Sequence, residues 1–111
     1  MASKKKKVQK RKPIDARRHL EKLIGGPLTF GLMIESTRLA EEMALEPFAR
    51  RLGVSRAYLC DVEKGRRKVS VERAAAWARK LGCLESQYVA LALQAEVTAA
   101  GLNLKVSVKA A

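Results

Sequence analysis

Residues 45–64, LEPFARRLGVSRAYLCDVEK, carry the most informative pattern in the chain. The apolar side chains of this stretch fit one short helix, a tight turn and a second helix. These side chains are Phe48, Leu52, Val54, Leu59 and Val62. Ala49 is small enough to let the two helices cross closely. Gly53 follows the first helix, where the chain must take a positive φ, which glycine adopts without a Cβ clash. Ser55 then offers its hydroxyl as the N-cap of the second helix.

The stretch resembles the helix-turn-helix of the Xre/Cro family of DNA-binding proteins. Ala49 and Gly53 match the alanine and glycine of that motif, and the five apolar residues match its apolar positions. The resemblance covers residues 29–94 and implies an all-α, five-helix, lambda-repressor-like domain. Arg38 and Glu63 match two family charges that usually pair, so the resemblance implies a structural Arg38–Glu63 ion pair. An unrelated helical hairpin with a basic face is the alternative.

Basic residues outnumber acidic ones in this chain of 111 residues, 23 against 11, which gives a net charge of +12. The length fits one domain. Residues 1–12 (MASKKKKVQKRK) contain seven basic side chains and no acid, so the remainder still has a surplus of five. A basic surface attracts polyanions with strong salt dependence. Alternatively, such a surface only keeps the protein soluble.

We expect four segments along the chain. Residues 1–12 are predicted to be a disordered basic tail, which either lies along phosphates or only aids solubility. Residues 13–27 are predicted to form an extra N-terminal helix and a linker, because apolar side chains recur at helical spacing before Gly25-Gly26-Pro27. Residues 28–101 form the helix-turn-helix DNA-binding domain. Residues 102–111 form a C-terminal strand or tail.

The domain is predicted to contain helices over 30–42, from 45 onward, and over 55–64, 71–81 and 85–100. Thr29 and Ser70 are placed as N-caps of two of these helices. Trp77 lies at helical spacing with small apolar residues and is predicted to be in the core. One departure from the family is Ala44-Leu45, where a capping serine and a phosphate-contacting glutamine are usual, so the docking contacts of that helix differ from those of the family.

The end of the chain changes its hydrophobic period. Leu102, Leu104, Val106 and Val108 alternate with polar residues, which is typical of a half-buried strand. A single strand has no partner inside a helical domain. We therefore expect a short C-terminal β-strand that pairs with a second copy or another protein, with a flexible tail as the alternative.

The outer face of the second motif helix supplies the candidate base contacts. Since Leu59 and Val62 must face the core, Arg56 and Cys60 point outward as an i, i+4 pair. Arg56 can make two hydrogen bonds to guanine O6 and N7. Asp61 can accept from cytosine N4 or orient Arg56, and Cys60 can contact a thymine methyl or be passive. The family resemblance places these residues at the bases or nearby phosphates: Ser55, Arg56, Ala57, Cys60 and Asp61.

A second group of residues is expected to contact phosphates and position the protein on the duplex without reading sequence. Its members surround the end of the same helix and the loop that follows. They are Tyr58, Lys64, Arg66, Arg67 and Lys68. For Tyr58, plain packing is an equal alternative.

Other chemistries have little support. Cys60 and Cys83 lie 23 residues apart without a CxxC pair, and His19 is the only histidine, so we expect neither a metal site nor a cofactor. No paired carboxylates, nucleophile–histidine pair or phosphate loop indicates an enzyme. No apolar run fits a bilayer span or a signal peptide. We expect a cytoplasmic protein with no catalytic residues.

The leading functional prediction is a sequence-specific, double-stranded DNA-binding transcriptional regulator. It would be a repressor that binds as a homodimer to a near-palindromic operator, with half-sites about one turn of DNA apart. Short members of the family include HigA-like antitoxins, which neutralise a toxin protein and repress their own operon, and this is the first alternative. A phage-type switch and a non-specific nucleoid or RNA-binding protein are the others.

Overall fold

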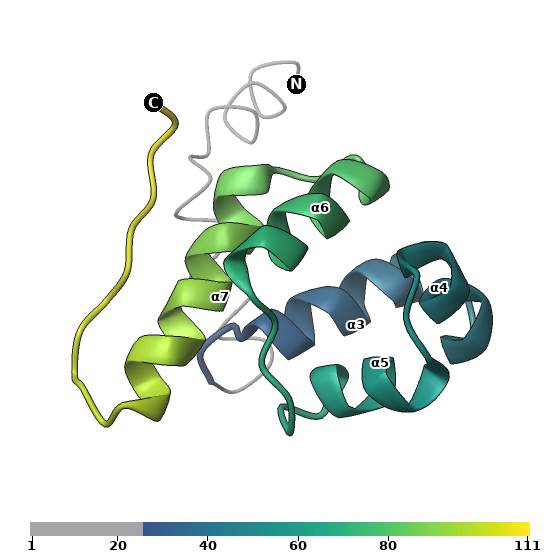
Figure 1. Ribbon diagram of the computed structural model, residues 1–111, viewed down its shortest axis with the longest axis horizontal. Helices are drawn as coiled ribbons and strands as arrows, with labels where there is room; N and C mark the ends of the chain where they lie inside the picture. The colour runs from purple at the N-terminus through teal and green to yellow at the C-terminus, as the bar shows by residue number, and fades with distance from the viewer. Residues whose placement is uncertain (1–25) are drawn as a thin grey trace, which may run out of the picture.

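The computed structural model describes residues 26–111, which contain five α-helices (Figure 1). Their bounds are α3 Phe30–Ala40, α4 Leu45–Leu52, α5 Arg56–Glu63, α6 Val71–Leu81 and α7 Glu85–Ala99. The predicted all-α, five-helix domain is therefore confirmed. The predicted tail, and nearly all of the predicted N-terminal helix and linker over 13–27, lie outside the described residues.

Three of the helices begin at the side-chain caps predicted from the sequence. Thr29 Oγ1 accepts a hydrogen bond from the N–H of Leu32 at 3.2 Å. Ser55 Oγ accepts from the N–H of Tyr58 at 3.0 Å, and Ser70 Oγ accepts from the N–H of Arg73 at 3.1 Å. Each cap satisfies a backbone donor that has no partner within its helix. By contrast, α4 follows Ala44 without a side-chain cap.

The first helix is shorter than predicted. It ends at Ala40, and Glu42 takes a positive φ of 55°. The turn brings the carbonyl oxygen of Met43 within 3.0 Å of Arg38 Nη1. A helix continued to residue 42 would carry that carbonyl away from the guanidinium. The end of α3 is thus set by a contact that its apolar spacing does not reveal.

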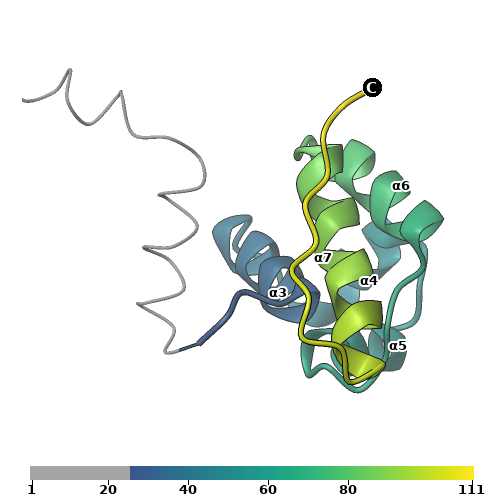
Figure 2. The same ribbon diagram turned by 90° about the vertical axis from the view of Figure 1, so that its left-hand side faces the viewer.

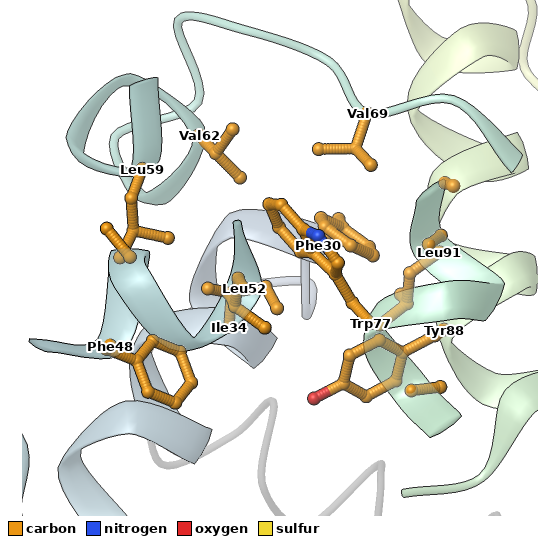
Figure 3. Packing of buried hydrophobic residues seen from close by; sticks show 14 of the residues in the cluster. Phe30, Ile34, Phe48, Leu52, Leu59, Val62, Val69, Trp77, Tyr88 and Leu91 are labelled. Atoms are coloured by element: carbon orange, nitrogen blue, oxygen red, sulfur yellow. The ribbon is translucent and has the colours of Figure 1, made fainter. Parts of the chain in front are cut away.

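The core lies where all five helices meet (Figure 3). Phe30 is at its centre, with its ring 6.1 Å from that of Trp77 and 5.7 Å from that of Tyr88, in an edge-to-face arrangement with the latter. Trp77 is 2% exposed, which confirms its predicted place. The buried Tyr88 hydroxyl lies 3.0 Å from Thr37 Oγ1 and donates to Cys83 Sγ. Burial raises the pKa of Tyr88.

The predicted C-terminal strand is wrong for this structure. Residues 102–111 form neither helix nor strand, and they run extended beside α7 (Figures 1 and 2). The Gln94 side chain holds them: its Nε2 donates to the carbonyl of Leu104 at 2.9 Å, and its Oε1 accepts from the N–H of Val106 at 2.7 Å. A strand needs a neighbouring backbone ladder, whereas one amide side chain supplies only two bonds.

Within the described part of the chain, no helix is both long enough and apolar enough to cross a membrane.

Candidate nucleic-acid interface

The helix-turn-helix is formed by α4, a turn at Gly53 and α5 (Figure 1). Gly53 has φ 78°, and its N–H bonds to the carbonyl of Arg50. The N–H of Val54 bonds to the carbonyl of Ala49 at 3.0 Å, which closes the end of α4. Ala49 is 1% exposed. The glycine and the alanine therefore lie where the motif requires a left-handed turn and a small buried side chain.

The orientation of α5 follows from its buried residues. Leu59 and Val62 are 0% and 1% exposed, respectively, so they fix which side of the helix faces the core. The predicted base-contacting residues lie on the other side. Ser55, Arg56 and Ala57 are exposed, whereas Cys60 and Asp61 are half-buried. The fold thus gathers all five on one outer face.

Arg38 and Glu63 form a two-pronged ion pair between α3 and α5. Arg38 Nε donates to Glu63 Oε2 at 2.8 Å, and Arg38 Nη2 donates to Oε1 at 3.0 Å. The hydrogen bond to Glu63 raises the pKa of Arg38. The two side chains are 13% and 5% exposed, so the pair is closed off from a DNA partner. This geometry fits the structural role that the family resemblance implies.

Asp61 pairs with Arg66 rather than orienting Arg56. Arg66 Nε and Nη2 lie 3.0 and 2.9 Å from Asp61 Oδ1, and the N–H of Arg66 bonds to the carbonyl of Asp61 at 2.8 Å. The suggestion that Asp61 orients Arg56 has no support in this geometry. Among residues 26–111, the Arg56 side chain makes no hydrogen bond or ion pair and is free to contact a base.

The ring of Tyr58, at the edge of this outer face, contacts two arginine side chains. The guanidinium carbons of Arg67 and Arg73 lie 5.0 and 5.1 Å from the centre of its ring. Trp77 meets the same ring edge-to-face, with centroids 6.4 Å apart. Sequence reasoning missed Arg73, because its position beside Tyr58 depends on where the tertiary fold places α6 relative to α5. Tyr58 is half-buried, so it both packs and supports cationic side chains that can reach phosphates.

The remaining predicted phosphate contacts follow the end of α5. Lys64, Arg66 and Lys68 are all exposed. Lys68 Nζ lies 3.2 Å from Glu96 Oε1 of α7, in a pair that is about half exposed on both sides. Such exposed pairs contribute little to stability and can be exchanged for another anion. The structure therefore brings the predicted cations together along one loop.

The cysteines and the acidic side chains of the described residues are the candidate metal ligands. Cys60 and Cys83 are free thiols. No group of three His, Cys, Asp or Glu side chains among residues 26–111 is arranged to hold a metal ion.

Comparison with known families agrees with this geometry. The family model HTH_3, described as helix-turn-helix, matches residues 34–88. These residues include the whole of α4, α5 and α6. The chain therefore belongs to the Xre/Cro-type helix-turn-helix family. Searches of curated proteins and of solved structures gave no match to the chain.

Proposed function

We propose that the protein is a sequence-specific regulator of transcription that inserts α5 into the major groove of double-stranded DNA. The observation that carries the proposal is the arrangement of Arg56, which is exposed and unpaired within the described residues while Leu59 and Val62 anchor the opposite side of its helix. A guanidinium in this position can form the two-bonded contact to guanine. Family membership supports the same role.

We propose that the loop of residues 64–68, called the cationic loop below, positions the protein on the duplex. Four basic residues follow the exposed face of α5, and no acid lies among them: Lys64, Arg66, Arg67 and Lys68. The two acids that precede them in α5, Asp61 and Glu63, are each paired with an arginine. Phosphate contacts of this kind fix the register of a protein on DNA and give salt-dependent affinity. We further propose a repressor that acts as a homodimer, since two copies of α5 in successive major grooves would read a near-palindromic operator. No catalytic activity is proposed.

The experiment is selection of bound sequences from a random duplex pool, followed by affinity measurements on the selected and random duplexes. The selected site should be bound about 10³-fold or more tightly than random DNA. Arg56→Ala should remove about 1–3 kcal/mol of that preference and relax the sequence at one position.

Arg67→Ala is the matched control, because it removes the same charge from the phosphate-contacting loop. It should weaken binding to both duplexes equally and lower the salt slope by about one. An Arg56→Ala variant that keeps its operator preference would contradict the assignment. Equal affinity for all duplexes before any substitution would favour the non-specific nucleic-acid-binding alternative.

An antitoxin function is the second candidate, and the C-terminal segment favours it. Leu102 and Leu104 are 53% and 62% exposed on an extended backbone that Gln94 holds along one edge. The other edge has no hydrogen-bond partner among the described residues, so a strand of another protein can pair with it. Truncation after Gly101 tests this: loss of a co-purified toxin with unchanged operator binding would support it. A truncated chain that still binds its partner would exclude the segment.

A further inference from the structure

A groove opens beside the cationic loop, at the end of the molecule where three elements meet. The start of α3, the end of α5 with its following loop, and the second half of α7 line a volume of about 520 Å³. The floor is apolar, because Phe30, Val62, Val69 and Leu91 line it and are nearly fully buried. Small-molecule sites of proteins have volumes of roughly 300–1,000 Å³ and largely apolar walls. The groove is within that range.

Close helix packing on one side and small side chains on the other shape this groove. A Cβ added at Gly31 would collide with the carbonyl oxygen of Val62 and lie 2.8 Å from that of Glu63, so glycine lets α3 touch the end of α5. The α7 wall carries Ala92, Ala95 and Ala99, whose methyl groups leave the space open. Larger side chains on α7 would fill it.

The charge at the groove is positive. Lys64, Arg67 and Lys68 line it, and the acid on its wall, Glu63, is already neutralised by both prongs of Arg38. Lys64 makes no ion pair among the described residues, and Lys68 has only the half-exposed Glu96. An apolar floor under a rim of cations selects a ligand with an apolar body and an anionic head.

We propose that the groove binds a small amphipathic anion, such as a medium-chain carboxylate, with its apolar part over Leu91 and Ala95 and its head at Lys64 and Lys68. The regulatory part of this inference rests on the proposed function. The same cations are assigned to DNA phosphates, so a bound anion occupies them and competes with the duplex. The ligand acts as an inducer that releases the DNA.

Binding is tested without DNA by calorimetric titration of the full chain with octanoate and, separately, with octylammonium. Octanoate should bind and octylammonium should not, because the two share an apolar tail and differ in head charge. Ala95→Phe should abolish octanoate binding by filling the groove. Ala100→Phe is the matched control, since Ala100 follows the same helix outside the groove lining, and it should bind octanoate as the unmodified chain does.

A second wall variant, and a measurement of the molecular mass of the protein in solution, keep the test decisive. Ala99→Phe replaces Ala95→Phe if the latter fails to fold, because Ala99 is exposed on the same wall. Lys64→Gln should weaken octanoate binding about tenfold, because it removes one hydrogen bond to a charged group. Equal binding of both probes, or unchanged octanoate binding by the wall variants, overturns the proposal. The absence of octanoate binding overturns it as well. So does a molecular mass in solution showing that the unmodified chain is a dimer and the wall variants are monomers, because a second copy would then occupy the groove.

The DNA readout separates this inference from the proposed function. Octanoate should lower the affinity of the unmodified chain and of Ala100→Phe for the selected duplex, and it should leave that of Ala95→Phe unchanged. Octanoate binding with no effect on a bound duplex overturns the inducer role. If octanoate binds but no duplex does, the proposed function fails and the anion site stands. If DNA binds but octanoate does not, the anion site fails and the proposed function stands.

Discussion

The inner and outer faces of α5 each hold a carboxylate paired with an arginine, and the two pairs differ in their access to water. On the inner face, Glu63 and Arg38 are 5% and 13% exposed and share two bonds. On the outer face, Asp61 and Arg66 are 39% and 60% exposed. Water can replace either partner of the outer pair, and a phosphate can do the same. Thus one short helix carries a fixed contact that holds the fold and an exchangeable contact available to a ligand.

Removing each carboxylate in turn should give the largest difference between the two faces. Glu63→Ala leaves the Arg38 guanidinium buried without its partner and should lower the free energy of unfolding by about 3–5 kcal/mol. Asp61→Ala, the matched exposed change, should cost at most about 1 kcal/mol. Urea unfolding followed by circular dichroism measures both. Similar losses for the two variants would remove the distinction between the faces.

The inner face also depends on the close approach of α3. Gly31→Ala places a methyl group against the Val62 and Glu63 carbonyls and should destabilise the protein by about 1–3 kcal/mol, because the helices must move apart. Gly26→Ala is the control, since a Cβ there has no atom within 4 Å. Thermal melting of both variants gives the comparison. A Gly31→Ala variant as stable as the unmodified chain would mean that this packing is looser than described.

The smallest expected effect comes from the cap where the outer face begins. Ser55→Ala removes the hydrogen bond to the N–H of Tyr58 and should cost about 1 kcal/mol of stability. Because the first turn of α5 carries Arg56, operator affinity should fall as well. Ser107→Ala, at an exposed position of the C-terminal segment, should change neither quantity. Reduced operator affinity without any loss of stability would show that Ser55 acts through a DNA contact alone.

The sequence was sufficient to predict the elements whose causes are local. The caps at Thr29, Ser55 and Ser70 and the turn at Gly53 depend on neighbouring residues, and all four lie where predicted. The inward side of α5 follows from Leu59 and Val62 alone. The helices and the outer face of the candidate site could therefore be placed without coordinates.

Contacts between elements that are far apart in the sequence could not be predicted from local patterns. Arg73 meets Tyr58 only because side chains of α6 reach across to α5, and the close approach at Gly31 depends on the path of α3. The alternating apolar residues after Gly101 looked like a strand, since alternation does not distinguish a backbone partner from the Gln94 side chain. Pairings set by tertiary packing leave no periodic signal in the sequence.

Trp77 is the only tryptophan of the chain, and it lies between the rest of the core and Tyr58, at the edge of the proposed DNA-binding face. Its indole is buried and touches Tyr58, the ring that carries Arg67 and Arg73. Any shift of those arginines toward a phosphate changes the surroundings of this one chromophore. The protein thus contains an intrinsic fluorescence reporter, through which titration with DNA can be followed without an attached dye.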